Sequence, residues 1–142
     1  MQTVSQLLKL KGNQIFSVAP HESVLRAIEI MATRYVGALL VMSQGSLIGI
    51  ISERDYARKV ILKKRSSHDT PVGDIMTSPA VTVTPSDTIH HCMQLMTERR
   101  IRHLPVMDAG RVVGMLSIGD LVKAVIEEQR DQIEQLERYI AG

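Results

Sequence analysis

The sequence is poor in aromatic residues and has no tryptophan. Only 3% of its 142 residues are aromatic, whereas 44% are hydrophobic. A core built from this chain therefore consists mainly of valine, isoleucine, leucine, methionine and alanine side chains. A chain of this length is sufficient for one compact domain.

Features of secreted and membrane-spanning proteins are also missing. The single cysteine, Cys92, cannot form an internal disulfide, which fits a reducing compartment. No run of about 18 apolar residues is present, as a membrane-spanning helix requires. The first residues, Met1 to Ser5, lack the charged and apolar stretch of a signal peptide. We therefore expect a cytoplasmic protein with no membrane partner.

The sequence also lacks the marks of a nucleic-acid-binding protein. Its net charge is only +2, so general electrostatic attraction to nucleic acid is not indicated. The densest cationic group, Arg99 to His103, has no interleaved aromatic residues on which bases could stack. We expect no nucleic-acid partner.

Catalytic and metal-binding patterns are missing as well. No nucleophile with an adjacent base and no phosphate loop of the G-x-x-x-x-G-K-[ST] type is visible. His90, His91 and Cys92 are consecutive on an expected helix, so they point in different directions and do not indicate a zinc site. An enzyme is the least favoured class, and we expect no catalytic residue and no metal.

The sequence does contain an internal duplication, with an offset of 65 positions. Residues 15–61 align with residues 80–126 without a gap. The matched identities include Pro20 and Pro85, Gly49 and Gly114, Ser52 and Ser117, and Asp55 and Asp120. Repeats of this length are too small to bury an apolar face alone, so we expect the copies to pack on each other and to form paired clefts.

Each copy has the pattern of a strand, a helix, a hairpin and a second helix, which predicts an α/β fold of two pseudo-symmetric β-α-β-β-α repeats. In the first copy the expected elements are a strand at 16–18, a helix over 24–31, a hairpin of 38–42 and 47–51, and a helix from 52 to about 62. In the second copy they are a strand at 81–83, a helix over 89–96, a hairpin of 104–107 and 112–116, and a helix from 117. The polar stretch 63–71 reads as the connector. The predicted division is residues 1–65, 66–126 and 127–142.

Beyond the second copy, the sequence predicts a C-terminal amphipathic helix. Ile126, Ile133, Leu136 and Ile140 follow one another at spacings of 7, 3 and 4 among polar residues. Such a stripe needs a partner surface. Two interpretations remain open: the helix packs back on its own chain, or it contacts another subunit.

The two Gly-x-x-Ser-x-x-Asp motifs place a hydroxyl and a carboxylate where a buried strand turns into a helix. Ser52 with Asp55, and Ser117 with Asp120, resemble capping boxes, in which both side chains satisfy the opening turn of a helix. The same geometry also suits a ligand, because a carboxylate can accept both hydrogen bonds of a ribose diol. Both motifs follow strands at their carboxyl ends, where open α/β arrangements leave ligand crevices.

At these motifs the sequence resembles a tandem cystathionine-β-synthase (CBS) domain pair, also called a Bateman module. The resemblance covers about residues 8 to 126 and depends on the stretches 48–55, 102–106 and 114–120 and on the two matched prolines. It implies a regulatory module with no chemistry of its own, which binds adenine nucleotides or related adenosyl ligands in two symmetry-related clefts. In such pairs the aspartate holds the ribose, and each cleft borrows the segment that leads into the other copy.

Carried over residue by residue, the resemblance implies two unequal clefts. The first takes Ala38, Ser52, Arg54, Asp55, Thr77, Ser78, Pro79, Ala80, Ile101 and Arg102, with Arg58 one helical turn beyond Arg54. The second takes Gly12, Asn13, Gln14, Ile15, Val36, Gly37, His103, Ser117, Gly119 and Asp120. The first cleft has more arginines and suits more phosphate charge, whereas Gly119 stands in the second where Arg54 stands in the first.

Three functional interpretations follow. The leading one is a stand-alone sensor of energy or redox state that binds AMP, ADP, ATP or NAD, with S-adenosylmethionine as a further ligand, and signals to an unidentified partner. A structural or partner-bridging module with empty clefts comes second, and an enzyme last. Members of the family commonly pair by a two-fold axis, so we expect a homodimer. The helix faces expected to meet are those of Val24, Ile28 and Met31 and of Ile89, Met93 and Met96.

Overall fold

A computed structural model describes residues 2–141 of the chain. The chain forms two compact units whose bounds differ from those of the sequence repeats. The first unit contains Ile15 to Val81, and the second combines the N-terminal segment up to Gln14 with the chain from Thr82 onward. Each repeat is thus completed by a segment that precedes the other repeat in the sequence.

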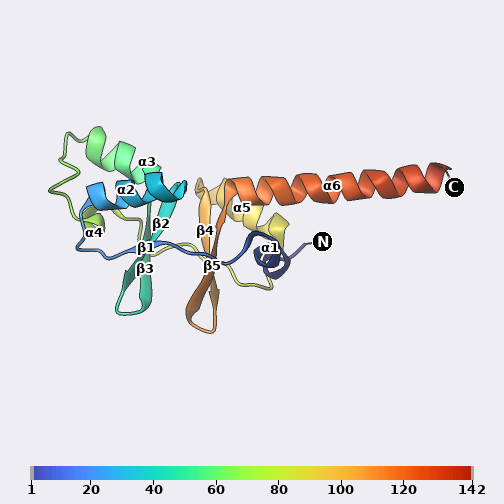
Figure 1. Cartoon of the computed structure of the whole chain (residues 1–142), viewed down its shortest axis with the longest axis horizontal. Coiled ribbons are helices and arrows are strands. Elements are labelled where there is room, and N and C mark those ends of the chain that lie inside the picture. Colours follow the sequence, from blue (N-terminus) through green and yellow to red (C-terminus); the bar gives the residue numbers. More distant parts are fainter. Residues whose placement is uncertain (1, 142) are drawn as a thin grey trace. The chain divides into compact units, whose positions relative to one another are not determined.

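The first unit contains a mixed three-stranded sheet with helices that follow its strands (Figure 1). Strand β1 pairs with β2 in parallel, and β2 pairs with β3 in antiparallel orientation. The elements are β1 (Ser17–Val18), α2 (Val24–Arg34), β2 (Ala38–Ser43), β3 (Ser46–Ser52), α3 (Glu53–Tyr56), the π-helical turn η1 (Ala57–Ile61) and α4 (Val72–Ile75). The predicted hairpin and both predicted helices of this copy are confirmed.

The second unit repeats this pattern around an antiparallel pair of strands. Its elements are α1 (Val4–Lys11), α5 (Ile89–Arg99), β4 (His103–Asp108), β5 (Arg111–Ser117) and α6 (Ile118–Ala141). The strand expected at 81–83 is reduced to one parallel bridge, between Val83 and Val106. The α/β fold class with two similar repeats and a C-terminal helix is confirmed.

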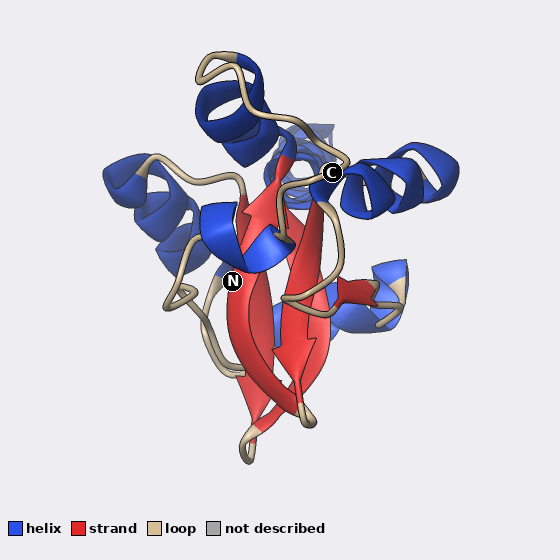
Figure 2. Ribbon diagram, turned by 90° about the vertical axis from the view of Figure 1, so that its left-hand side faces the viewer, coloured by secondary structure: helices blue, strands red, loops and turns tan. Residues whose placement is uncertain are grey.

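Both hairpins, whose turns are the tan ends of the red strands in Figure 2, turn through two residues with positive φ. The turn residues are Gln44 and Gly45 (φ 51° and 78°) in the first, and Ala109 and Gly110 (φ 50° and 78°) in the second. Two successive positive φ values define the type I′ turn, whose twist matches that of the flanking strands. The glycine at the second turn position, Gly45 in one copy and Gly110 in the other, therefore has a local role in the turn.

The predicted apolar face of each first helix is buried within its own unit. Val24 is 0% and Met31 3% exposed, and they belong to a cluster with Leu39 and Ile51 of the sheet. Full burial of such side chains contributes about 1.5 to 3 kcal/mol each. Their counterparts Ile89, Cys92 and Met96 are buried in the second unit. The expectation that these faces meet a second subunit is therefore wrong for their buried members.

Cys92 behaves as a small apolar core residue. Burial and the nearby charge of Asp87 raise the pKa of its thiol to about 11. Within residues 2–141 no group of three or more histidine, cysteine or acidic side chains is arranged to hold a metal ion.

Two short helices were not expected from the repeat pattern. Helix α1 begins with a capping box of Thr3 and Gln6, a signal that is present in the sequence but lies outside the duplicated region. Helix α4 follows the connector, which is not a fully solvated linker. Thr70 in the connector is buried, and its carbonyl accepts a hydrogen bond of 2.8 Å from the amide of Val24.

Helix α6 is continuous through the boundary expected near residue 127. Its buried residues are Leu121 and Ala124, both in its first part. Residues 129–141 are all exposed, so the alternative in which this end packs on its own chain is not found. The helix extends past α1 and α5 of the same unit (Figure 1). None of the helices within residues 2–141 is long and apolar enough to cross a membrane.

The segment that leads into the second repeat adds one bridge to the sheet of the first unit. Ile50 and Thr77 exchange two backbone hydrogen bonds, of 3.0 and 2.8 Å. A Cβ on Gly49 would lie 2.7 Å from the carbonyl oxygen of Thr77. In the second unit, a Cβ on Gly114 would lie 2.7 Å from the Cδ2 atom of Leu8 on α1. Both repeated glycines therefore admit a segment from outside their own repeat.

These two glycines form a matched pair for a stability test. In Gly49→Ala the added methyl group meets backbone atoms that two hydrogen bonds hold in place, so we expect a loss of about 1 to 3 kcal/mol in the free energy of unfolding. In Gly114→Ala the methyl group meets the end of a flexible leucine side chain, which can rotate away, so we expect a smaller loss. Urea denaturation of the wild type and both variants measures the difference. An equal or larger loss in Gly114→Ala would contradict this account.

Candidate functional site

The two repeated motifs form capping boxes at the carboxyl ends of β3 and β5. In the first unit, the amide of Ser52 donates to Asp55 Oδ2 (3.0 Å), and the amide of Asp55 donates to Ser52 Oγ (3.2 Å). In the second unit, the corresponding distances for Ser117 and Asp120 are 2.8 and 3.2 Å. Both predicted caps are confirmed. The remaining question is what else contacts the two carboxylates.

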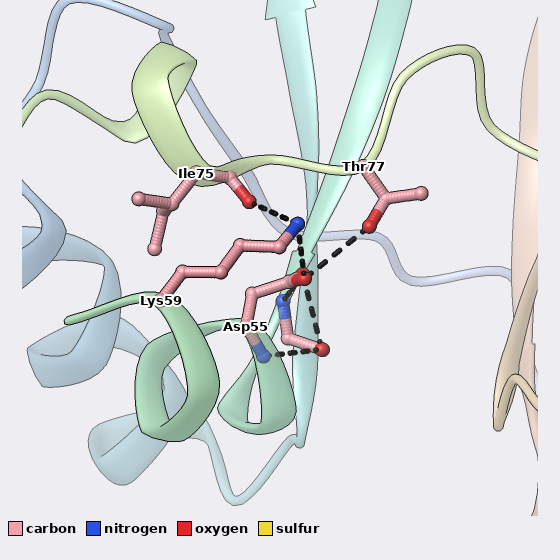
Figure 3. A network of polar contacts seen from close by, with 5 residues as sticks. Asp55, Lys59, Ile75 and Thr77 are labelled. Carbon is pink, nitrogen blue, oxygen red and sulfur yellow. Dashed lines mark hydrogen bonds and ion pairs between the residues drawn. The ribbon is translucent and has the colours of Figure 1, made fainter. Parts of the chain in front are cut away.

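The carboxylate of Asp55 is almost fully buried and accepts contacts from three different segments (Figure 3). Its Oδ2 atom also accepts from the hydroxyl of Ser52, at 3.1 Å. Its Oδ1 atom accepts from Thr77 Oγ1 at 3.3 Å and lies 3.0 Å from Lys59 Nζ. The predicted pairing of Thr77 with this motif is therefore present in the structure.

Lys59 is a site residue that the sequence interpretation missed. Besides its ion pair with Asp55, its Nζ atom donates to the carbonyl of Ile75 at 2.9 Å (Figure 3). Lys59 lies on the π-helical turn, and such turns are frequent at functional sites. The spacing of four residues between Asp55 and Lys59 is a signal that could have identified the pair.

In the second unit, a lysine from a different segment contacts the equivalent carboxylate. Lys11, at the end of α1, lies 2.6 Å from Asp120 Oδ2 and donates to the carbonyl of Met115 at 2.6 Å. Burial acts to raise the pKa of Asp120, but the hydrogen bonds from Lys11 and from the amide of Ser117 outweigh it, so the pKa lies below its ordinary value. No repeat signal indicated Lys11, because Met76 stands at the matching position of the other copy.

His103 lies beside the second motif, as predicted, and is opposite Ser117 in the strand register. Burial lowers the pKa of His103. The charge of Asp120 acts in the opposite direction, and those of Lys11 and Arg102 act in the same direction as burial. The imidazole is therefore neutral near pH 7, where it can donate or accept a hydrogen bond but brings no positive charge.

Several other predicted residues lie close to their motif within the same unit. Ala38 is opposite Ser52 in the strand register, and Ser78 Oγ donates to the carbonyl of Ile48 at 2.6 Å. Arg54 follows Ser52 by two residues at the start of α3, and Arg58 lies on the π-helical turn. The Ser78 hydroxyl is therefore occupied by the sheet in this state.

The remaining predicted residues lie on exposed segments or belong to the unit that does not contain their motif. Gly119 is exposed on the first turn of α6, and a Cβ there would meet only Ser117 Oγ, at 3.7 Å. Gly12, Asn13 and Gln14 form an exposed segment after α1. Pro79 and Ala80 belong to the same unit as their motif, Ser52 and Asp55. Ile15, Val36 and Gly37 were assigned to the second motif but belong to the first unit. Ile101 and Arg102 were assigned to the first motif but belong to the second unit. Their roles stay predictions.

The lowered pKa of His103 predicts how stability depends on pH. The unfolded chain binds this proton near the ordinary pKa of 6.5, whereas the folded chain binds it only at lower pH. Stability is therefore lost as the pH falls from about 6.5 toward the folded pKa. In His103→Gln the part of the stability loss that comes from this imidazole disappears. Urea denaturation at pH 7.5 and 5.5 measures the free energy of unfolding of both proteins at each pH. His68→Gln, which removes an imidazole that is 81% exposed, is the control. Equal pH dependence in His103→Gln and the wild type would refute the assignment.

Comparison with known proteins identifies the family. The model of the CBS domain matches twice, at residues 10–62 and 72–127. The CBS domain-containing protein CBSX3, mitochondrial, of Arabidopsis thaliana is 44% identical over 149 residues, which cover 99% of this chain and 72% of the relative. The structure of a protein with CBS domains from Burkholderia ambifaria is 50% identical, covers 90% of this chain and 96% of its own, and has a TM-score of 0.87.

One similar structure contains a bound nucleotide. The CBS domain protein PAE2072 from Pyrobaculum aerophilum, complexed with AMP, is 26% identical, covers 84% of this chain and 89% of its own, and has a TM-score of 0.75. The two matches to the family model include both Ser-x-x-Asp motifs and cover most of the sequence. The chain therefore belongs to the CBS domain family and carries two copies of that domain.

Proposed function

We propose that the chain is a regulatory module that binds an adenine nucleotide at Asp55, and a second one at Asp120, and signals its presence to a partner protein. The observation that carries the proposal is the position of the two carboxylates. Each caps a helix at the end of a buried strand, and each is contacted by a segment from outside its repeat, through Thr77 in one unit and Lys11 in the other. A ligand that changes these contacts acts on the segments that connect the repeats.

A ribose suits these carboxylates chemically. Its two neighbouring hydroxyl groups can donate to the two oxygens of one carboxylate, and hydrogen bonds to a charged group contribute about 1.5 to 3 kcal/mol. Arg54 and Arg58 lie within one helical turn of Asp55 and can complement phosphate charge. The AMP complex of the Pyrobaculum relative supports an adenine nucleotide as the ligand. NAD, ADP and ATP contain the same adenosyl group. We further propose that the module has no catalytic activity and acts in the cytoplasm.

Nucleotide binding can be tested by thermal and calorimetric measurements. At a ligand concentration 100 times the dissociation constant, AMP, ATP or NAD should stabilise the protein by about 2.7 kcal/mol. Asp55→Ala should weaken the tighter binding event by roughly tenfold to a hundredfold, because that site has the arginines. Asp120→Ala should affect the weaker event, and Asp108→Ala, at the exposed end of β4, should affect neither.

Two outcomes would contradict the proposal in different ways. A larger effect of Asp120→Ala on the tighter event would refute the ranking of the two sites. No shift in melting temperature with any of the three nucleotides would favour the alternative, a partner-bridging module in which Ser52 and Asp55 only cap a helix. In that case Ser52→Ala should still cost about 1 kcal/mol of stability.

We also propose that the module is a homodimer in which α6 pairs with its counterpart. Its apolar stripe is exposed, from Val122 (42%) to Leu136 (61%) and Ile140 (83%). When the stripe is placed at positions a and d of a heptad, Arg130 and Glu137 both fall at position e, on the same side of the stripe. Antiparallel pairing places Arg130 of one copy near Glu137 of the other, whereas parallel pairing brings no opposite charges together. Charge complementarity therefore favours the antiparallel pair.

Truncation tests the role of α6 in assembly. A chain that ends at Gln129 lacks residues 130–141, which are all exposed in the structure, and keeps Glu128, whose Oε2 atom lies 3.7 Å from His90 Nε2. We expect this chain to keep its melting temperature and to dimerise more weakly in light scattering, and Leu136→Glu to do the same. Asp131→Asn, off the stripe, is the control. A monomeric full-length protein at micromolar concentration would refute the dimer, and undiminished dimerisation of both variants would refute the role of α6.

A further inference from the structure

We propose that Lys59 and Lys11 make the two sites selective for phosphorylated adenosyl ligands over neutral ones, because each lysine occupies the carboxylate that a ribose needs. The inference rests on the proposed function, since it concerns the same two carboxylates. It narrows the ligand from any adenosyl compound to an anionic nucleotide.

The acceptor capacity of Asp55 is fully used in this state. A carboxylate offers about four lone-pair positions to donors. The amide and hydroxyl of Ser52 both donate to Oδ2, while the hydroxyl of Thr77 and the ammonium group of Lys59 contact Oδ1. A ribose diol would bring two more donors. It can therefore bind Asp55 only if existing donors leave.

The contacts differ in how easily they can be released. The amide of Ser52 belongs to the helix cap, and Thr77 is fixed to Ile50 by two backbone hydrogen bonds, so only its hydroxyl can rotate. Lys59 has a long flexible side chain that is 44% exposed. The lysine is therefore the charged donor that a ribose displaces.

Displacement changes the charge balance at the site. Once the diol holds Asp55, the ammonium group of Lys59 loses its counter-charge and keeps only a neutral acceptor, the carbonyl of Ile75. A neutral nucleoside brings no replacement, whereas the phosphate of a nucleotide brings negative charge and strong acceptors. The same displacement is therefore less favourable for adenosine than for AMP.

The second unit also has a lysine on its carboxylate, although there the amide of Ser117 and Lys11 both contact Oδ2. Lys11 comes from α1 and contacts Asp120 at 2.6 Å, whereas Lys59 comes from the helix of the aspartate itself. The two lysines are not repeat equivalents, because Met76 matches Lys11 and Ala124 matches Lys59. The duplication alone therefore does not account for a lysine on each carboxylate. Two independent positions supply one ammonium group per site.

The test compares a charged and a neutral ligand on the same variants. In Lys59→Met and Lys11→Met, we expect adenosine to bind about two- to fivefold more tightly, because no ion pair has to open. AMP should bind about tenfold more weakly, because a charged donor to its phosphate is lost. Titration calorimetry with both ligands measures the ratio of the affinity for AMP to the affinity for adenosine. Lys63→Met and Lys9→Met, which remove exposed lysines near the same helices, should leave the ratio unchanged.

Melting curves establish that the variants fold, and Lys59→Gln and Lys11→Gln repeat the test with polar side chains. A shift of adenosine and AMP by the same factor in both pairs of variants would overturn the lysine inference and leave nucleotide binding standing. Wild-type protein that binds neither AMP nor adenosine would overturn both the proposed function and this inference. A ratio of AMP affinity to adenosine affinity that falls in the Lys59 and Lys11 variants, but not in the Lys63 and Lys9 controls, supports selectivity for phosphate.

Discussion

The two backbone hydrogen bonds between Ile50 and Thr77 are the constraint on which the first site depends. They attach the segment that leads into the second repeat to the edge of β3. This attachment brings the Thr77 hydroxyl to Asp55 and requires a glycine at position 49. Sheet edges left unpaired are prone to wrong association, so the bridge also protects β3 at this point. The connection between the repeats and the geometry of the site are therefore one structural feature.

In the second unit the added segment is a helix, α1, and not an extended segment such as the one that contains Thr77. Leu8 of α1 packs against Gly114, and Lys11 holds both Asp120 and the carbonyl of Met115. The side-chain contacts of Lys11 are easier to release than a pair of backbone hydrogen bonds. The two sites thus share their carboxylates and caps but differ in how firmly the added segment is held. If both sites bind the proposed ligand, this difference predicts that they respond to it unequally.

Sequence analysis predicted the parts of the fold that the duplication repeats. The hairpins, the helix caps at Ser52 and Ser117 and the CBS family follow from local patterns that occur twice, so each copy supports the other. Helix α1 lies outside the aligned region, and its place depends on contacts with β5 that no local pattern encodes. The buried faces of α2 and α5 were assigned to a dimer interface because amphipathicity shows that a face is covered, but not what covers it.

The sequence analysis predicted the two carboxylates of the candidate site but missed its two lysines. Asp55 and Asp120 occupy equivalent positions and were found by repetition. Lys59 and Lys11 do not occupy equivalent positions, and a long lysine side chain can reach an acceptor from many backbone positions. Long flexible side chains are thus the part of a site that sequence symmetry predicts least well. Their contacts follow from three-dimensional proximity alone.

Helix α6 begins immediately after Ser117, so its first turn contains Asp120 of the second cap, and residues 129–141 at its other end are all exposed. Its 24 residues correspond to a rod about 36 Å long at a rise of about 1.5 Å per residue. A tilt of about 5° at the capped end of such a rod moves the other end by about 3 Å, which is comparable to the width of a hydrogen bond. A small rearrangement at the Asp120 carboxylate would therefore produce a larger displacement at the exposed end of the helix.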